Sequence, residues 1–555
     1  MTDKKGLPRR DVLRGLLAAG VLASTNTVGS AQPNSPGNAS ESNPNSQGNP
    51  NSPGHPNSGT PKRGGRIRVA SVSSSTADTL DPAKGALSTD YARLYMVYSG
   101  LTQFDSTLTA QPALAEEIHD SGRILWTFKL RNGVQFHDGK PLTPADVVYS
   151  LLRHKNPATA SKVKTIAEQF QEIRASGPNE VQIRLTGANA DLPAILATSH
   201  FLIVQDGTTE FRTAIGTGPY RCKEFNPGVR TVAVRNPNYW KPGKPYLDEI
   251  ELVGIADESS RVNALLSGDV QLVNAVDPRS IRRVAASPDH AVQETKSGLY
   301  TDLIMRQNMS PTGHPDFVLA MKYLLDRELT RKALFRGYAT LANDQPIHPG
   351  NRYYLAGLPQ RPYDPERAKF LLKKAGLIGQ RLVVYASPAA EGSVDMASLL
   401  QESAAGIGLN LAVNRVPADG YWSNHWMKHP LGFGNTNPRP TADLLFSTYF
   451  KSDAPWNEAA WKSGQFDQLL LAARGEGDEV KRKQIYGDMQ VLVHETGGIG
   501  IPVFISLIDG YDKRLRGYGS IPIGGLMGYQ FADNVWLDGP TTHASRPHAL
   551  RSLPA

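Results

Sequence analysis

The sequence predicts an α/β protein with more than one domain. A chain of 555 residues is too long to be organised around one hydrophobic core, so two or three domains are expected. Strand patterns also alternate with helical patterns: residues 250–255 are β-like, residues 257–268 form a helix that Asp257 can cap, and residues 270–273 are β-like again. This order is typical of an α/β lobe.

Residues 1–61 precede the part of the chain that is expected to fold. Residues 1–31 have the features of an export signal, because Arg9 and Arg10 stand before a short apolar segment and small residues follow at 29–31. The apolar run is far shorter than the ~20 residues of a membrane span. Residues 32–61 are an Asn/Ser/Pro/Gly tract with almost nothing apolar to bury, which predicts a disordered linker.

Composition argues against several classes of function. The formal net charge of +8 is spread along the chain rather than concentrated in runs, so it does not indicate a nucleic-acid partner. No nucleophile elbow, phosphate-binding loop, zinc-protease motif or paired-cysteine metal motif occurs. The one cysteine, Cys222, cannot form an internal disulfide. We therefore expect a protein that is not an enzyme, with no catalytic residues, no cofactor and no assigned metal ligand.

The first half of the folded part mixes short strands and helices. Its expected start is a strand, a Ser/Thr-rich loop and a helix, at residues 66–70, 71–80 and 91–101. Residues 126–130 alternate apolar and polar side chains as in a strand. Thr143 is expected to cap the next helix, with Asp146 completing a capping box.

The second half contains longer helical patterns. Apolar residues at helical spacing predict one long helix over residues 316–335. Another helix is expected to begin at Asp364 and to end at Gly376, where a left-handed backbone favours glycine. The other expected elements are strands over residues 382–385, 409–413 and 497–504 and helices over residues 396–405 and 478–494.

Residues 215–255 carry the most distinctive pattern, in which GTGPY, RNPNYW and KPYLDEI combine tight turns with aromatic residues. Between them, Val232 and Val234 alternate with their neighbours as in a half-buried strand. This segment resembles the signature of the large periplasmic solute-binding proteins of ABC importers, the dipeptide/oligopeptide-binding family (bacterial extracellular solute-binding family 5). The resemblance extends over nearly the whole chain after residue 62, including PALAEEI at residues 112–118.

The resemblance implies an architecture for the whole chain. It is an α/β, two-lobed periplasmic-binding-protein fold with an extra inserted domain, in which a hinge links the lobes and the ligand cleft lies between them. The chain crosses between the lobes near residues 295–300 and 500–506. The implied parts are lobe one (residues 62–95, 212–297 and 505–540), the inserted domain (residues 96–211), lobe two (residues 298–504) and a tail (residues 541–555).

The resemblance also implies a function. It is that of a periplasmic receptor that captures a peptide or peptide-like solute by lobe closure and delivers it to the membrane permease complex of an ABC importer. We expect a soluble monomer, exported by the twin-arginine pathway, that is not lipid-anchored. The alternatives are a metal or metal-chelate (nickel-type) binding protein and an opine or sugar-conjugate binding protein of the same family. His425 and His429, four residues apart, keep the metal alternative open.

Residues 419–443 are the segment in which we expect the ligand to be recognised. Aromatic residues precede residues 432–440, which are too rich in Gly, Asn and Pro for regular structure, and a loop held between helices suits ligand capture. In the family, this segment and the loop after the first strand face the cleft. The ligand-binding candidates are Ser73, Ser74, Thr76, Tyr421, Trp422, Phe433, Asn435, Thr436, Asn437, Arg439 and Asp443.

Two anchors of the peptide-binding relatives are absent. The aspartate that holds the ligand's amino group in those proteins corresponds to Thr436, and residues 387–395 contain no arginine for the ligand's carboxylate. Arg439 is expected either to contact an anionic ligand or to form an ion pair with Asp443. The other charged residues that can replace the missing anchors are Glu391 and Arg415.

Overall fold

The computed structural model describes residues 59–539. The predicted export signal, residues 32–58 of the predicted linker and the predicted tail lie outside the described residues. Between residues 59 and 539, no helix combines the length and the apolar character that crossing a membrane requires.

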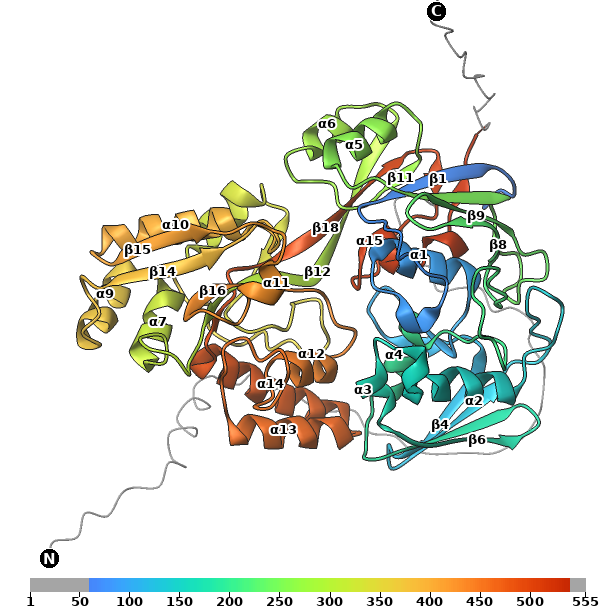
Figure 1. The fold of residues 1–555 in the computed structure, drawn as a ribbon, viewed down its shortest axis with the longest axis horizontal. Coiled ribbons are helices and arrows are strands. Elements are labelled where there is room, and N and C mark those ends of the chain that lie inside the picture. Colours follow the sequence, from blue (N-terminus) through green and yellow to red (C-terminus); the bar gives the residue numbers. More distant parts are fainter. Residues whose placement is uncertain (1–58, 540–555) are drawn as a thin grey trace, which may run out of the picture. The chain divides into compact units, whose positions relative to one another are not determined.

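A mixed sheet of 12 strands runs through the described part of the chain (Figure 1). We call one half of this sheet, with the helices that cover it, lobe one. There β1 is parallel to β10 and β11, and β9 and β8 continue the sheet in antiparallel fashion beyond β10. These strands are β1 (Arg66–Ser71), β8 (Tyr220–Asn226), β9 (Arg230–Arg235), β10 (Glu249–Gly254) and β11 (Leu272–Val273).

The other half of the sheet, with its helices, is lobe two. Here β14 (Arg381–Ala386) lies parallel to β15 (Asn410–Arg415) on one side and to β16 (Leu431–Thr436) on the other. The short strands β13 (Ala339–Leu341) and β17 (Ile499–Gly500) add to the long strands at the middle of the sheet.

Two long strands, β12 (His290–Met305) and β18 (Val503–Asp512), join the lobes (Figure 1). They are antiparallel to each other, and their register shifts between Thr295 and Leu299. At the shift, the Ser297 hydroxyl donates to the Ile505 carbonyl at 2.9 Å. Because β12 continues beside β16 in lobe two and β18 beside β11 in lobe one, the chain passes between the lobes along these two strands.

A second, separate sheet of four antiparallel strands is inserted between β1 and β8 in the sequence. The helix α2 (Pro144–Leu152) follows its second strand, and the Asp146 carboxylate accepts from both the amide and the hydroxyl of Thr143 at 2.7 Å, which confirms the capping box. The strands are β4 (Ala115–Ser121), β5 (Leu125–Leu130), β6 (Phe170–Gly177) and β7 (Glu180–Leu185), and β2 (Thr102–Phe104), β3 (Ala110–Pro112), α3 (Lys164–Ala167) and α4 (Leu192–Leu196) complete the region.

Helices pack on both lobes. Those of lobe one are α1 (Ser88–Val97), α5 (Glu258–Leu266), α6 (Ile281–Ala285) and the short turn α15 (Gly525–Gly528), with the small β19 (Leu515–Arg516) and β20 (Trp536–Leu537) pair beside them. Those of lobe two are α7 (Pro315–Tyr323), α8 (Arg327–Leu329), α9 (Pro365–Lys374), α10 (Ser393–Gly406), α11 (Tyr421–Asn424), α12 (Ala442–Tyr449), α13 (Gly464–Gly475) and α14 (Glu479–Thr496).

The GTGPY motif packs directly against the end of α1. A Cβ atom on Gly216 would lie 2.1 Å from the Val97 carbonyl oxygen, and one on Gly218 would lie 2.4 Å from the Val97 carbonyl carbon. No side chain fits there, so both glycines are needed for the close approach of two backbones.

Several sequence-based expectations about elements are wrong. The strand expected over residues 497–504 is interrupted at residues 501–502, so β17 ends at Gly500 and β18 begins at Val503. The long helix over residues 316–335 is broken, because Asp326 caps a new turn by accepting from the Leu329 amide and Arg327 turns into the lobe toward Asp344. The helix expected at residues 91–101 is α1, which begins at Ser88 and ends at Val97. Strand β9 is not half-buried, since Thr231 and Ala233 are as buried as Val232: α1 covers their face, and Arg93 donates to the Thr231 hydroxyl.

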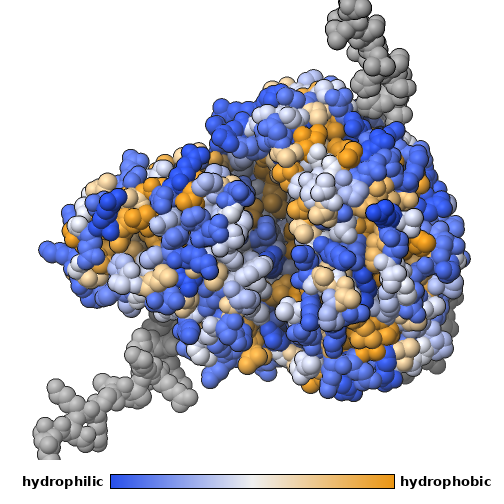
Figure 2. All heavy atoms as spheres, viewed as in Figure 1, coloured by the Kyte–Doolittle hydropathy of each residue, from blue (hydrophilic) through white to orange (hydrophobic). Residues whose placement is uncertain are grey.

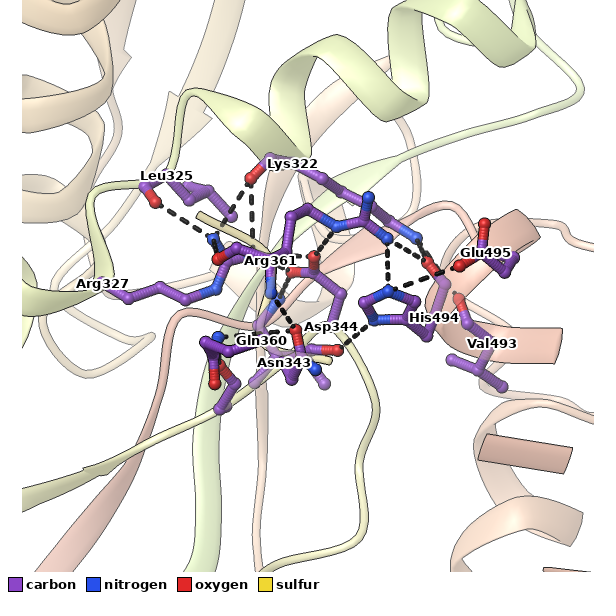
Figure 3. Close-up of polar contacts among 12 residues, drawn as sticks. Lys322, Leu325, Arg327, Asn343, Asp344, Gln360, Arg361, Val493, His494 and Glu495 are labelled. Carbon is purple, nitrogen blue, oxygen red and sulfur yellow. Dashed lines mark hydrogen bonds and ion pairs between the residues drawn. The ribbon is translucent and has the colours of Figure 1, made fainter. Parts of the chain in front are cut away.

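A buried set of charges ties together the segments of lobe two that follow this break (Figure 3). The Asp344 carboxylate accepts from Arg327 at 2.7 Å and from Arg361 at 2.9 Å. Beside them, the Lys322 ammonium donates to the carbonyls of Val493 and His494 at the end of α14. We call Lys322, Arg327, Asp344, Arg361 and His494 the Asp344 cluster.

Candidate ligand-binding cleft

The surface of the described chain is hollowed between the lobes, along the line where α11 and α12 face α1 and α4 (Figures 1 and 2). The lobe-two side of this cleft is built by β16 and by the segments that follow it. The expectation of an irregular loop over residues 432–440 is wrong for its first half, because residues 431–436 form β16 between β12 and β14. One of its glycines has a close neighbour: a Cβ on Gly434 would lie 2.5 Å from a Glu458 oxygen.

Four aromatic side chains form a continuous wall on lobe two. Trp422 contacts Trp426 with ring centroids 5.7 Å apart, Trp426 contacts Trp456 at 6.1 Å, and Trp456 contacts Tyr449 at 5.5 Å. Trp422 and Trp456 are about two-fifths exposed, at 42% and 41%, which is unusual for large apolar rings that have a packing role alone. We call these four residues the aromatic wall.

Arg439 stands at one end of the aromatic wall. Its guanidinium lies 5.5 Å from the ring centroid of Tyr449 and 6.0 Å from that of Trp456, and it donates to the Tyr449 hydroxyl at 2.8 Å. The expected ion pair between Arg439 and Asp443 is wrong: the buried Asp443 carboxylate accepts from Arg474 at 2.9 Å. Helix α12 turns Asp443 inward toward α13, so Arg439 keeps donors for another partner.

The lobe-one side of the cleft is also aromatic. Tyr91 of α1 lies with its ring centroid 5.3 Å from Tyr529 and 5.6 Å from His200. Burial raises the pKa of Tyr91, and the charge of Arg439 opposes that rise.

An unusual backbone turn holds Tyr529 in place. Leu526, Met527 and Tyr529 all have positive φ angles, of 54°, 57° and 68°, which are costly for residues other than glycine. The buried Asp509 carboxylate stabilises this turn by accepting from the Leu526 amide at 2.8 Å. Such strain persists only where the surrounding structure enforces it.

The candidates in the first loop have partners within lobe one. The Ser73 hydroxyl contacts the Ser88 hydroxyl at 2.9 Å, and the Ser74 hydroxyl donates to Asp78 at 2.7 Å. Thr76 is exposed. These contacts fix the loop, and they leave Thr76 as the side chain of the three that is most open to solvent.

The candidates in and after α11 divide between core and surface. Tyr421 and Phe433 are buried, and the Tyr421 hydroxyl donates to the Phe433 carbonyl at 2.6 Å. Thr436 is fully buried, whereas Asn437 is exposed at the end of β16. The Asn435 amide donates to the Thr301 hydroxyl at 2.9 Å. Of these candidates, Trp422 is therefore exposed and Arg439 lies beside the aromatic wall, whereas Tyr421, Phe433, Thr436 and Asp443 are buried.

His425 and His429 do lie together, although α11 ends at Asn424. Their ring nitrogens Nδ1 and Nε2 are 3.1 Å apart, and the His429 ring stacks on Tyr385 with centroids 3.5 Å apart. Desolvation, with a further contribution from His425, lowers the pKa of His429. Over residues 59–539, no three His, Cys, Asp or Glu side chains are grouped so as to hold a metal ion.

The inserted region also contacts lobe two. The Ala190 amide donates to the Arg474 carbonyl at 2.9 Å, and Arg482 of α14 forms a buried ion pair with Asp191 at 2.8 Å. A cavity of about 280 Å³ lies beside this contact, lined by residues of the inserted region and of lobe two such as Arg123, Trp126, Asp191, Tyr353, Thr441 and Arg482. The described structure therefore has the inserted region in contact with lobe two.

Sequence reasoning missed part of this site. Tyr91, Tyr449 and Tyr529 were not among the candidates, since an isolated tyrosine on a helix has no local signal that separates the cleft from the core. The signal that was available is the cluster of aromatic residues around Trp456, which follows the segment that the family resemblance placed at the cleft.

Comparison with known proteins supports this description. The model of the bacterial extracellular solute-binding proteins, family 5 Middle, matches residues 109–458. The chain is 25% identical over 482 residues to the glutathione-binding protein GsiB of Escherichia coli strain K12, covering 83% of this chain and 92% of that protein.

Two solved structures are similar as well. One is the ABC transporter-associated periplasmic binding protein DppA from Helicobacter pylori in complex with the peptide STSA, with a TM-score of 0.73, 22% identity and coverage of 86% of this chain and 99% of that chain. The other is NikZ from Campylobacter jejuni in complex with Ni(L-His), with a TM-score of 0.73, 20% identity and coverage of 84% and 99%. They confirm the two-lobed fold, and the family match spans more than half of the sequence. The chain belongs to the bacterial extracellular solute-binding proteins of family 5, the solute-capturing receptors of ABC importers.

Proposed function

We propose that this protein captures a peptide or peptide-like solute in the cleft, in the periplasm, and delivers it to the permease complex of an ABC importer. The observation that carries the proposal is the position of Arg439, which lies over Tyr449 and Trp456 of the aromatic wall. A planar guanidinium offers paired donors to a carboxylate, and the rings on both sides offer apolar surface to the rest of a solute.

The two peptide-binding relatives support this choice of ligand. GsiB binds glutathione and DppA is in complex with a peptide, and both match most of this chain. In this chain the amino-group anchor is replaced by the buried Thr436, so the ligand is held by its carboxylate at Arg439 and by its apolar groups at the wall. Trp422, Arg439 and Asn437 are the candidates on the surface of the cleft, and Tyr91, Trp456 and Tyr529 are added to them.

Lobe closure is part of the proposal. Burial of the ligand between the lobes favours the closed state that a permease recognises. The Asp191–Arg482 ion pair and the Ala190–Arg474 hydrogen bond join the inserted domain to lobe two, and we expect opening of the cleft to break them. Small-angle scattering should give a larger radius of gyration for ligand-free Asp191→Asn than for ligand-free parent protein. Equal radii would show that this contact does not hold the lobes together.

A nickel-chelate ligand is the second candidate, because His425 and His429 are 3.1 Å apart and NikZ is in complex with Ni(L-His). The stacking of His429 on Tyr385 engages this pair within lobe two, and Arg439 and the aromatic wall suit an organic anion better. An opine or sugar conjugate would meet the same Arg439 and the same wall. We therefore place the peptide first.

The proposal includes the route by which the protein reaches its compartment and its division into domains. We propose twin-arginine export of a soluble monomer without a lipid anchor, and the parts given above, with the separate four-stranded sheet within the inserted domain. Arg9→Lys combined with Arg10→Lys should leave the precursor in the cytoplasm. Mature double mutant in the periplasm at the normal level would contradict this route.

The function is tested by a thermal-shift panel of di- to pentapeptides, glutathione, an opine, a sugar conjugate and Ni(L-His). A ligand at ~100 times its Kd stabilises the native state by roughly 2.7 kcal/mol. Peptides or glutathione should raise Tm, and this shift should shrink in Arg439→Met but persist in Arg415→Met, which removes an exposed arginine of β15. Stabilisation by Ni(L-His) alone would support the second candidate, and no shift with any peptide would contradict the first.

A further inference from the structure

Two carboxyl groups are buried directly behind the aromatic wall. Asp302 of β12 is fully buried, and its residue is opposite Gly434 of β16. Glu458 is 5% exposed and comes from the loop that also carries Trp456. Gly434 lacks a side chain at the place where the Glu458 carboxyl lies, so the two acids meet across this glycine.

The pair has no counter-charge. Throughout residues 59–539, no Lys, Arg or His pairs with either carboxyl, and the nearby titratable groups are the phenols of Tyr300, Tyr421 and Tyr449. Arg306 contacts this region, but it donates to the backbone carbonyl of Glu458 rather than to its side chain, at 3.1 Å. Two buried carboxylates without a cation are costly, and they also repel each other.

One proton shared by the two carboxyl groups removes the repulsion between them. Neither oxygen of Asp302 has a hydrogen-bond donor while both acids are ionised, because two carboxylates can only accept. Burial raises the pKa of both groups, and a hydrogen bond between the two side chains forms once one of them holds a proton. The Glu458 Oε1 atom already accepts from the indole Nε1 of Trp426 at 2.7 Å. A protonated Glu458 can therefore accept from Trp426 with one oxygen and donate to Asp302 with the other.

We propose that Glu458 is a positioning residue of the ligand site: in its protonated form it bridges Asp302 and Trp426 and so holds the central ring of the aromatic wall. This inference rests on the proposed function only in that the wall is the ligand surface. The bridge itself is a property of lobe two and exists without ligand. Loss of the shared proton would leave two adjacent anions behind Trp426 and would release the indole.

The sign of the pH dependence follows from the raised pKa values. Between the pKa of the unfolded carboxyls, about 4, and the higher folded values, the unfolded state has lost protons that the folded state keeps. Stability contributed by the pair is therefore fully present at acidic pH and is lost as pH rises. Glutamine at position 458 keeps one donor and one acceptor but cannot lose a proton.

The experiment compares the parent protein with Glu458→Gln and Glu458→Met, without added ligand. Each is labelled with 5-fluorotryptophan, and the resonance of Trp426 is assigned from its absence in Trp426→Phe. At pH 6 we expect the Trp426 resonance of Glu458→Gln to have the same chemical shift as in the parent protein. The Trp426 resonance of Glu458→Met should have a different chemical shift. From pH 6 to pH 9 the resonance should shift in the parent and stay in place in Glu458→Gln.

Denaturant unfolding gives a second readout. Below the folded pKa of the pair, the unfolding constant of the parent should rise with pH more steeply than that of Glu458→Gln, by up to about tenfold per pH unit, and this difference in slope should end where the Trp426 resonance shifts, which is the signature of one proton. If Glu458→Met does not fold, Asp302→Asn is measured instead. In Asp302→Asn the Trp426 resonance should stay at the parent position, and the pH dependence of the unfolding constant should be smaller by the contribution of one proton. Parallel pH profiles, or a Trp426 resonance that Glu458→Met leaves unchanged, would overturn the inference. Neither outcome depends on finding a ligand, so failure of the peptide panel would count against the proposed function alone.

Discussion

Two buried sets of ionisable side chains in lobe two are stabilised in opposite ways. In the Asp344 cluster, one carboxylate is surrounded by the cations of Arg327 and Arg361, with the Lys322 ammonium nearby (Figure 3). Behind the aromatic wall, Asp302 and Glu458 face each other without a cation. Electrostatic pairing lowers the pKa of Asp344 against the opposing effect of burial, while burial raises the pKa values of the second pair.

This difference in charge pairing distinguishes a cluster that stabilises the fold from a pair that acts on the ligand site. The Asp344 cluster joins loops that are far apart in the sequence, and its side chains are engaged with one another and with backbone carbonyls. The Asp302–Glu458 pair contacts the aromatic wall through Trp426, so its protonation state acts on the cleft. Substitution at the first place should therefore affect folding, and substitution at the second should affect the site.

The largest expected effect is that of Asp344→Asn. It leaves Arg327 and Arg361 buried without their anion, which should lower the free energy of unfolding by about 3–5 kcal/mol. Urea denaturation measures this change. Asp316→Asn is the matched control, because its pair with the exposed Lys374 should contribute less than about 1 kcal/mol. A small effect at Asp344 combined with a large one in Glu458→Gln would reverse the comparison.

Sequence reasoning could foresee the fold better than either charged site. Caps, glycines and alternating strands act locally, so Thr143, Asp257 and Gly376 marked helix boundaries that the structure confirms. The break at Asp326 could not be foreseen, since it accompanies the buried pairing of Arg327 with Asp344, which is seventeen residues further along the chain. Long-range partners of this kind have no periodic signal.

The site shows the same division. The motif around Arg439 pointed to a segment in which Trp422 belongs to the aromatic wall and Arg439 lies beside it, and their contact with a ligand stays a prediction. The partner of Asp443 was wrong because Arg474 approaches from a different helix, and four-residue spacing alone did not reveal it. Glu458 has no local pattern at all, since its role comes from a glycine on a neighbouring strand.

The next effect in size concerns binding rather than folding. If Arg439 holds the carboxylate of the ligand, Arg439→Met should weaken binding of the panel's best peptide by about 2–5 kcal/mol, much of it from leaving the ligand's charge buried and unpaired. Tm without ligand should change little, because Arg439 has no ion pair among residues 59–539 and only one hydrogen bond there, to Tyr449. Calorimetric titration and a melting curve separate the two. A lower Tm with unchanged affinity would assign Arg439 a structural role.

The smallest effect is a difference in pH slope. Burial lowers the pKa of Lys322 to about 7, so between about pH 7 and the unfolded value near 10.4 the unfolded state binds a proton that the folded state lacks. Stability from this group therefore rises with pH, opposite in sign to that of the Asp302–Glu458 pair. Lys322→Met should remove up to about 1.4 kcal/mol per pH unit of that rise. Equal slopes for Lys322→Met and the parent would show that Lys322 stays charged.

The most direct test of the account is the response of the seven tryptophans to the panel's best peptide. In 5-fluorotryptophan-labelled protein, we expect the resonances of Trp422, Trp426 and Trp456 to shift on saturation and those of Trp461 and Trp536, both buried, to stay in place. Arg439→Met should abolish the shifts at the same peptide concentration. A response confined to Trp126, which lines the separate cavity beside Asp191 and Arg482, would contradict the account and place the ligand there.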